Sequence, residues 1–355
     1  MLKHSDIIYL GRSRLQRSHA NLIQLLHTAS GFVQLGWEVL VVLPPWPRRL
    51  SLSARLKELD VDPAPEVIPS QLLHPRWSFR PFIWRYRRDL LMAKAVYTRV
   101  AQISIVLARA GLKNHLEVHD VEALRRSGQI EPIIAYHRTG LIRTLTPISN
   151  GAAKSLINAG AVPERIHVAH SGVKLEAYAG LPPFNPDNLN RPRIIHLGRL
   201  SQQRGLEIYH YLAKHEKCKI SIISADKGSI PNAAYYPPVT LTEIPAWYAR
   251  SDLTLLPYQP SISTAATMSP IKMFEAMAAG RPIIASDLPT IREILKHEHS
   301  ALLVAPHDFE GWAAAIERLR QDRPLAVRLA TNARAAVSKY SWVDRARNIA
   351  GAIGL

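Results

Sequence analysis

Residues 193–205 read RIIHLGRLSQQRG, an apolar run followed by a loop with a glycine at each end. The apolar run predicts a buried strand, because short apolar runs bounded by turn residues are typical of parallel sheets. Gly198 permits a tight exit from this strand, and Gly205 stands where the next helix should begin. Arg199 and Arg204 could converge on one diphosphate through charge-assisted hydrogen bonds, as a nucleotide sugar would require.

A second stretch, residues 267–287, reads TMSPIKMFEAMAAGRPIIASD and predicts a loop, a helix with proline in its first turn, and a strand. Ser269 is placed to cap the helix, and the free amides of Ile271 and Lys272 would present partial positive charge to a phosphate. The ammonium of Lys272 adds a full charge. Glu275, one turn further on, could accept hydrogen bonds from both hydroxyls of a ribose. Taken alone, the arginines of the first stretch could be solvated loop residues, and the second stretch favours the diphosphate site.

Alternating strand and helix patterns surround these two stretches, and they predict an α/β protein with two tandem Rossmann-like, doubly wound domains. The predicted strands lie at residues 6–10, 38–43, 116–119 and 145–148 in the first half, and at 193–197, 219–224, 253–256, 282–285 and 301–304 in the second. A segment rich in Pro and Asn at 179–193 is interpreted as the interdomain linker. We therefore expect an N-terminal domain at 1–178 and a C-terminal domain at 194–339.

The composition is that of a folded globular protein, with 47% hydrophobic and 21% charged residues over 355 positions. A formal net charge of +17 favours anionic partners such as phosphorylated substrates, acidic lipid surfaces or nucleic acid. The single cysteine, Cys218, excludes an internal disulfide framework, so we expect a reducing, cytoplasmic setting. Residues 1–10 lack the pattern of a secretory signal, and no stretch is long and apolar enough to cross a membrane.

Two positions in the N-terminal half are candidates for a site. His119 ends a predicted strand, and the carboxyl ends of parallel strands are where open sheets bind ligands. Asp120 follows it as a weaker candidate base. Gly11, after the first strand, would let the backbone approach donor phosphates. The alternatives are a structural histidine and an ordinary basic loop around Arg12.

The chain resembles glycosyltransferase family 4, the retaining enzymes of the GT-B fold, over nearly its whole length. The likeness is most specific in the pair Arg199 and Arg204, in residues 269–282, in residues 148–150 with 166–173, and in residues 244–252. It implies two Rossmann-like domains around a deep interdomain cleft. It also implies that a last helix, at about 340–355, crosses back to the first domain, and that closure of the cleft gates the reaction.

The resemblance gives roles to single residues. Arg199 and Arg204 would grip the donor diphosphate, Glu275 the ribose, and the stretch around Glu243 would flank the nucleobase. His119 would lie close to the transferred sugar. Residues and resemblance together predict that the donor contacts Gly11, Gly198, Arg199, Arg204, Glu243, Ile244, Ser269, Ile271, Lys272 and Glu275, and that catalysis uses His119, Arg199, Arg204 and Glu275. Many family members carry two glutamates eight positions apart, and the first is Thr267 here, so the sugar is left open.

No Asp-x-Asp motif lies in a suitable loop, so we predict a reaction without a metal or another cofactor. The departing diphosphate would be stabilised by Arg199, Arg204 and a helix start, through an oxocarbenium-like state. No nucleophile for a covalent intermediate is identifiable. The resemblance therefore favours attack by the acceptor on the face from which the diphosphate leaves.

A basic aromatic segment, residues 76–88, interleaves five arginines with five aromatic residues. Aromatic rings favour the depth of lipid headgroups and arginines favour anionic lipid, so we predict a membrane or acceptor contact. The predicted contact residues are Arg76, Trp77, Arg80, Trp84, Arg85, Arg87 and Arg88. A core helix and single-stranded nucleic acid are the alternatives, and nucleic acid is disfavoured because no recognisable nucleic-acid module accompanies the segment.

The sequence as a whole predicts a retaining hexosyltransferase that is peripheral on the inner face of the cell membrane. It would take a sugar from a nucleotide diphosphate, with a UDP-sugar favoured and a GDP-sugar next. The acceptor would be a lipid-linked or envelope glycan, as in polysaccharide biosynthesis. The alternatives are a nucleotide-sugar epimerase of the same fold and a non-catalytic protein that binds lipid or nucleic acid.

Overall fold

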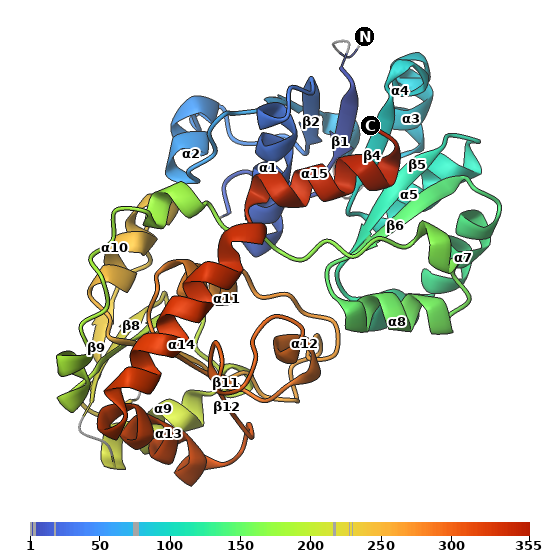
Figure 1. The fold of residues 1–355 in the computed structure, drawn as a ribbon. Coiled ribbons are helices and arrows are strands. Elements are labelled where there is room, and N and C mark those ends of the chain that lie inside the picture. The colour runs from blue at the N-terminus through green and yellow to red at the C-terminus, as the bar shows by residue number, and fades with distance from the viewer. Residues whose placement is uncertain are drawn as a thin grey trace. The chain divides into compact units, whose positions relative to one another are not determined.

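The computed structural model describes residues 2, 5–17, 19–73, 78–215, 218–226, 228 and 230–355. The chain divides into two compact units (Figure 1). Unit 1 consists of residues 1–172 together with 342–355, and unit 2 consists of residues 173–341. Both ends of the chain therefore belong to unit 1.

Unit 1 is built on a parallel sheet whose six described strands have the order β3-β2-β1-β4-β5-β6. The strands are β1 (Ile7–Leu10), β2 (Val39–Leu43), β3 (Glu66–Pro69), β4 (Ala95–Thr98), β5 (Asn114–Val118) and β6 (Ile142–Pro147). This is the order of a Rossmann domain, in which β1 and β4 are neighbours and the connections leave them in opposite directions. Ligands of such sheets bind outside the carboxyl ends of the strands at this point.

Helices cover both faces of the unit 1 sheet. They are α1 (Ala20–Gln34), α2 (Leu52–Glu58), α3 (Arg80–Arg85), α4 (Arg87–Met92), α5 (Ala101–Arg109), α6 (Val121–Arg126), α7 (Ile130–Arg138), α8 (Asn150–Asn158) and α15 (Trp342–Ile353), with the 3-10 turns η1 (Gln71–Leu73) and η2 (Pro163–Arg165). The last helix, α15, lies beside α1 (Figure 1). A Cβ added to Gly31 of α1 would lie 2.5 Å from the carbonyl oxygen of Trp342, so a glycine is what allows this close approach.

Unit 2 repeats the same topology. Its parallel sheet has the order β12-β11-β10-β7-β8-β9 in the described residues, so β7 and β10 take the places of β1 and β4. The strands are β7 (Arg193–Leu197), β8 (Lys219–Ile223), β9 (Ala234–Tyr236), β10 (Leu253–Leu256), β11 (Ile283–Ser286) and β12 (Leu302–Val304). The helices are α9 (Leu206–His215), α10 (Ile244–Ala249), α11 (Ile271–Ala278), α12 (Pro289–Arg292), α13 (Phe309–Gln321) and α14 (Arg323–Ala336), with the 3-10 turns η3 (Leu175–Tyr178), η4 (Pro186–Asn190), η5 (Gln202–Arg204), η6 (Leu241–Glu243) and η7 (Val337–Lys339).

The two sheets confirm the predicted fold class, two Rossmann-like α/β domains in tandem. The predicted domain limits at 178, 194 and 339 differ from the structure. The chain passes between the units at residues 172–173 and 341–342, so the segment 179–193 lies inside unit 2.

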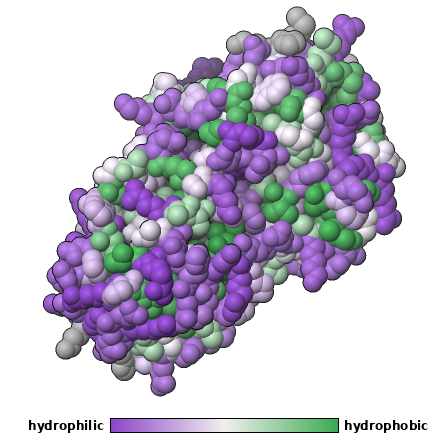
Figure 2. All heavy atoms as spheres, viewed as in Figure 1, coloured by the Kyte–Doolittle hydropathy of each residue, from purple (hydrophilic) through white to green (hydrophobic). Residues whose placement is uncertain are grey.

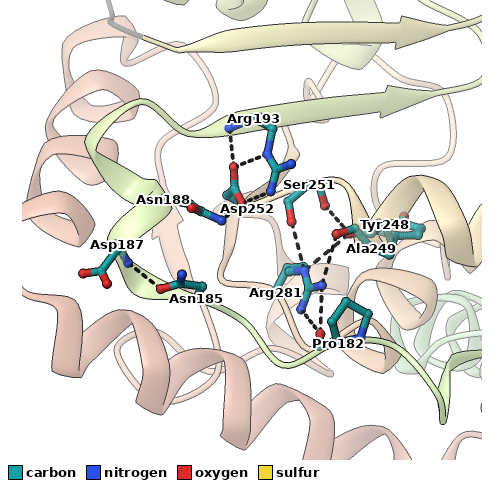
Figure 3. A network of polar contacts seen from close by, with 10 residues as sticks. All are labelled: Pro182, Asn185, Asp187, Asn188, Arg193, Tyr248, Ala249, Ser251, Asp252 and Arg281. Carbon is teal, nitrogen blue, oxygen red and sulfur yellow. Dashed lines mark hydrogen bonds and ion pairs between the residues drawn. The ribbon is translucent and has the colours of Figure 1, made fainter.

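Packing explains why the segment 179–193 is part of unit 2 and not a free linker. Leu189 is buried in the core of unit 2, with 1% of its surface exposed. Asn188 donates to the carboxylate of Asp252 at 2.9 Å. The buried guanidinium of Arg281 donates to the carbonyl of Pro182 at 3.0 Å (Figure 3). Composition marked this segment as irregular, but irregular backbone can still be held by specific polar contacts.

Candidate active site

The loop from β7 to α9 carries the first group of predicted residues. Gly198 directly follows β7 with a φ of +92°, and a Cβ at this position would lie 2.7 Å from Nζ of Lys272. Gly205 has a φ of +78° and directly precedes α9, and its Cβ would lie 2.5 Å from the carbonyl oxygen of Pro257. Both glycines are therefore required by backbone conformation and by close contact. The loop is held against the carboxyl end of β10.

A charged cluster lies at the carboxyl ends of β7 and β10. Arg204 and Lys272 line a small pocket there together with His196, Tyr248 and Tyr258. Burial lowers the pKa of Lys272, and Arg204 lowers it further while Glu275 opposes them. The structure therefore brings together two cations that the sequence had placed 68 positions apart. Binding of an anion would lower the electrostatic energy of this site, because the anion offsets the repulsion between the cations.

Glu275 lies one turn along α11 from Lys272 and is buried, with 9% of its surface exposed. Burial raises its pKa, and the charge of Lys272 works in the opposite direction. Burial raises the pKa of Tyr248 and Tyr258, and the charge of Glu275 adds to this effect at both rings. A buried carboxyl group beside the ammonium of Lys272 is suited to bind hydroxyl groups of a ligand.

The start of α11 differs in detail from the prediction. The helix begins at Ile271, and Pro270 takes the cap position with an extended φ of −71° and ψ of 123°. The cap position predicted for Ser269 is thus taken by Pro270, whose side chain makes no cap hydrogen bond. Proline has no side-chain acceptor of its own to offer the first amides of the helix. The amides of Ile271 and Lys272 are thus still oriented as the sequence predicted.

Two of the predicted donor contacts stand apart from the charged cluster. Arg199 is exposed on the loop and does not line the pocket. Glu243 is also exposed, and its carboxylate accepts from the amide and hydroxyl of Thr240 at 2.8 and 2.7 Å. Its side chain closes a capping box at the start of η6, which gives Glu243 a structural role, and Ile244 begins α10 directly after it.

A larger pocket of about 420 Å³ lies in unit 1, at the carboxyl ends of β4 and β5. His119 lines this pocket, as the sequence predicted for a residue at a strand end. The remaining lining residues are Arg12, Ser13, Asn21, Arg99, Val100, Ala101, Leu116, Glu117, Val118, Asp120, Ala123, Leu124 and Gln129. Asp120 caps α6, because its Oδ1 accepts from the amide of Ala123 at 2.8 Å. The carboxylate of Asp120 therefore has a structural partner.

Gly11 follows β1 and has a packing role in the structure. A Cβ at this position would lie 2.5 Å from Cδ1 of Leu25 and 2.7 Å from Cδ2 of Leu43. The glycine is therefore required where α1 and β2 meet the end of β1. Its predicted contact with donor phosphates stays a prediction.

The sequence reasoning missed Glu117, which lies on β5 and is buried, with 1% of its surface exposed. Its Oε2 accepts from the hydroxyl of Tyr97 at 2.9 Å and from that of Tyr9 at 3.4 Å. Nη2 of Arg345, from α15, lies 2.8 Å from the same oxygen. Oε1 of Glu117 accepts from Gln24 at 3.3 Å and contacts Nε2 of His119.

Electrostatics keep this carboxylate charged. Burial alone would raise the pKa of Glu117, but Arg345 and His119 hold it well below its usual range. Burial and the charge of Arg99 lower the pKa of His119 to about 4, so the imidazole is neutral at pH 7. No local sequence pattern signals this network, because its members come from β1, α1, β4, β5 and α15.

The basic aromatic segment forms α3 and α4, which are separated only by Tyr86. Arg76 and Trp77 lie outside the described residues, and the other five predicted contact residues are exposed. Trp84 is 81% exposed, and Leu91 and Met92, which were not predicted, are 60% and 70% exposed. The predicted alternative, a core helix, is wrong for this face of the segment. Hydrophilic and hydrophobic residues are interspersed on this part of the surface (Figure 2).

Among the described residues, no helix has the length and apolar character needed to cross a membrane. In the same residues, no group of three or more His, Cys, Asp and Glu side chains could hold a metal ion.

Comparison with known families identifies the segment that carries the charged cluster. Residues 191–322 match the family model described as glycosyl transferases group 1. This part of the chain is a group 1 glycosyl transferase domain. The match contains Arg199, Arg204, Glu243, Lys272 and Glu275, so the family resemblance expected from the sequence is confirmed at this level.

Curated relatives of the group 1 glycosyl transferase domain are themselves glycosyltransferases. A D-inositol 3-phosphate glycosyltransferase of Xylanimonas cellulosilytica is 26% identical over 220 residues, which cover 53% of this chain and 50% of that one. The amylovoran biosynthesis glycosyltransferase AmsK of Erwinia amylovora is 28% identical over 216 residues, which cover 54% and 51%. The chain thus spans about half the length of these curated relatives.

Solved structures extend the likeness to the whole chain. The Anabaena protein HepE, solved in complex with UDP, superposes with a TM-score of 0.75 at 18% identity, over 98% of this chain and 99% of that one. Sucrose-phosphate synthase from Thermosynechococcus elongatus superposes with a TM-score of 0.72 at 14% identity, over 98% of both chains. At these identities the likeness shows the fold, which is the GT-B fold of two Rossmann-like domains.

Proposed function

We propose that the protein is a retaining hexosyltransferase that takes its sugar from a nucleotide diphosphate and transfers it to a lipid-linked or envelope glycan. The observation that carries the proposal is the charged cluster of Arg204, Lys272 and Glu275 at the carboxyl ends of β7 and β10. The cluster lies inside the group 1 glycosyl transferase domain. A UDP-sugar is the favoured donor and a GDP-sugar the next, and HepE structures with UDP and with UDP-glucose support this order.

In the proposed reaction, the diphosphate binds to unit 2. Lys272, Arg204 and the first amides of α11 offset the negative charge that develops as the sugar leaves. Arg199, exposed on the same loop, can add a second guanidinium. Glu275 accepts hydrogen bonds from the ribose hydroxyls. These groups supply positive charge without a metal, so we propose a metal-independent transfer.

Unit 1 supplies the other part of the proposed reaction. Its pocket of about 420 Å³ has room for a sugar ring, and Arg12 and Arg99 border it with His119. The two arginines suit an acceptor that carries an anionic group, such as a lipid-linked phosphate. The relative that is named for amylovoran biosynthesis supports a glycan acceptor.

A panel of UDP-, GDP- and ADP-sugars tests the enzyme proposal. We expect one nucleoside diphosphate to be released during slow donor hydrolysis, and the same donor to raise the melting temperature. If no donor is hydrolysed and none stabilises the protein, the proposal is wrong. Release of nucleotide in the presence of a chelator would support transfer without a metal.

Substitution of Glu275 tests the donor site. Glu275→Ala should abolish transfer and Glu275→Gln should weaken it, because only the carboxylate can accept from two ribose hydroxyls. Both variants should keep the circular dichroism spectrum of the wild type. Glu310→Ala, at an exposed position in α13, is the control and should retain full turnover. Near-normal turnover of Glu275→Ala would place the donor elsewhere.

We also propose that α3 and α4 bind an anionic membrane surface. Arg88, Leu91 and Met92 follow the i, i+3 and i+4 spacing of one face of α4, Trp84 precedes them in α3, and all four side chains are exposed. Large apolar side chains flanked by arginines are suited to the headgroup region of an acidic bilayer. Arg87 is partly engaged, because it donates to the carbonyl of Ala110 at 2.7 Å.

Vesicle flotation tests the membrane proposal. The protein should float with vesicles that contain phosphatidylglycerol at low salt and should stay behind with purely zwitterionic vesicles. The double variant Trp84→Ser, Leu91→Ser should lose most of this binding. Val327→Ser, at a 41% exposed valine in unit 2, is the control and should bind as the wild type does. Failure of the wild type to float at low salt would remove the proposal.

A further inference from the structure

The buried carboxylate of Glu117 has no capacity left for a reaction of its own. Four donor groups hydrogen-bond to its two oxygens, Gln24 and His119 at Oε1 and Tyr9 and Tyr97 at Oε2, and Nη2 of Arg345 forms an ion pair with Oε2 at 2.8 Å. A carboxylate offers about four lone-pair sites, so these partners saturate it. Arg345 and His119 also keep its pKa well below the usual range, against the effect of burial. Glu117 is therefore a fixed negative charge and not a general base.

His119 is the one partner of Glu117 that also reaches solvent. Its side chain is 21% exposed and lines the unit 1 pocket, whereas the side chain of Glu117 is fully buried. Glu117 lies in β5, which ends at Val118, and His119 follows directly after this strand. Nε2 of His119 contacts Oε1 of Glu117. Nδ1 is thus the ring nitrogen left for a ligand.

The contact with Glu117 decides which ring nitrogen carries the proton. A carboxylate accepts and cannot donate, so Nε2 must be the protonated nitrogen. Arg99 and Arg345 disfavour a second proton on the ring, and burial does so more strongly. Among the described residues, Glu117 and these two arginines are the charged groups that shift the pKa of the ring.

We propose that Glu117 is a positioning residue that locks His119 as the neutral tautomer protonated at Nε2, so that Nδ1 faces a ligand as a hydrogen-bond acceptor. The ligand group is a hydroxyl of the sugar or of the glycan acceptor, because only a donor group can pair with an unprotonated nitrogen. This ligand assignment rests on the proposed glycosyl transfer, whereas the tautomer does not.

Arg345 extends this role to α15. Its Nε donates to the hydroxyl of Thr28 at 3.0 Å and its Nη1 donates to the carbonyl of His170 at 2.7 Å, while Nη2 lies against Glu117. One guanidinium thereby joins α15, α1 and the segment after β6 to the carboxylate beneath His119. The last helix of the chain is thus part of the support of the histidine.

The wild-type protein provides the decisive measurement. Histidine ring nitrogens are labelled with ¹⁵N, and His119 is assigned by the signal that disappears in His119→Asn. At pH 7 the long-range proton–nitrogen spectrum should show a neutral ring protonated at Nε2, and the ring should stay neutral down to pH 5. A ring protonated at Nδ1, or a doubly protonated ring at pH 7, would overturn the proposal. No substrate is needed, so this outcome is independent of the transferase proposal.

Two variants test whether the tautomer matters for turnover. Glu117→Gln replaces the fixed acceptor by an amide that can also donate, so kcat should fall on the order of 100-fold with the donor KM unchanged. Its His119 spectrum should show mixed tautomers. Tyr97→Phe removes a different hydrogen bond from the same carboxylate and should leave the His119 spectrum unchanged. Unchanged kcat and an unchanged spectrum in Glu117→Gln would overturn the proposal, and if that variant does not fold, the wild-type spectrum decides.

Discussion

Gly198 links backbone conformation to the position of a charge. Its φ of +92° is a conformation that residues with a side chain rarely adopt, and its missing Cβ leaves the space that Nζ of Lys272 approaches. The ammonium belongs to a flexible side chain, so a methyl group at residue 198 would displace it rather than prevent folding. Displacement would move the charge away from the place where a diphosphate is expected.

Substitution of Gly198 separates the effect of backbone strain from the effect of displacing the Lys272 ammonium. Gly198→Ala should lower the free energy of unfolding by about 1–2 kcal/mol through backbone strain and should raise the donor KM at least about tenfold through the displaced ammonium. Gly36 has a φ of +91° with no atom within 4 Å of an added Cβ. Gly36→Ala should therefore show the same loss of stability without a change in KM. Urea denaturation and initial rates measure both quantities, and equal donor KM values in the two variants would contradict the assignment of Lys272.

The contrast between Lys272 and Glu117 shows where prediction from sequence ends. Lys272 follows a Ser-Pro pair at the start of an amphipathic helix, a local pattern with a clear physical meaning. Glu117 lies in a short, fully buried strand, and its role depends on Tyr9, Tyr97 and Arg345, which are 108, 20 and 228 positions away. Local spacing carries no information about such contacts, because tertiary packing alone creates them.

At the scale of elements, Arg281 joins its own segment to two other stretches of unit 2. Its guanidinium donates to carbonyls of Pro182, Ser251 and Tyr248, at distances of 2.9–3.3 Å, and to that of Ala249 at 3.4 Å (Figure 3). The residue is 3% exposed and lies two positions before β11. Removing it would leave several buried carbonyls without a donor, which is more costly than losing one surface contact.

Arg281→Met should therefore destabilise unit 2 by about 2–4 kcal/mol. The matched control is Arg292→Met, because Arg292 forms an ion pair with Asp287 in which the two side chains are 56% and 31% exposed. Exposed ion pairs contribute little to folding stability, so this variant should change the free energy of unfolding by less than about 1 kcal/mol. Urea titrations followed by circular dichroism measure both variants. Similar midpoints for the two would show that the carbonyl contacts of Arg281 do not stabilise the unit.

Burial explains two of the three strands that sequence reasoning missed. The predicted bounds of β7 and β10 match the structure, since both are apolar runs that lie centrally in their sheet. β9 was missed, and all three of its residues are exposed at the sheet edge. β3, also missed and at an edge, has only one fully buried residue and ends in Pro69. These two strands lack the burial that produces an apolar run, whereas β4 was missed although it is central and fully buried.

At the scale of the whole molecule, the two units share a strand order but differ in their buried titratable groups. In unit 1, burial lowers the pKa of His115, His119 and His170 to about 4. In unit 2, burial lowers the pKa of His196 to about 3, but it raises that of Glu275. Histidines in an unfolded chain titrate near pH 6.5, so the two units respond differently to acid.

Acid should therefore unfold unit 1 before unit 2. Between pH 6.5 and 4 the unfolded chain binds protons that the folded histidines exclude, so stability falls as pH falls, by up to about 1.4 kcal/mol per pH unit for each histidine. Four histidines act in this way in unit 1, because burial also lowers the pKa of His137. In unit 2, the folded state takes up a proton at Glu275 before the unfolded chain does, which offsets the effect of His196.

Pulse proteolysis in graded urea at pH 7, 6 and 5, with fragments assigned to each unit by mass spectrometry, measures this difference. The urea midpoint of unit 1 should fall more steeply with acid than that of unit 2. His115→Gln, which removes one buried titrating group, should make the pH dependence of unit 1 shallower. Midpoints that fall in parallel, or a steeper fall in unit 2, would mean that the buried histidines do not control acid stability.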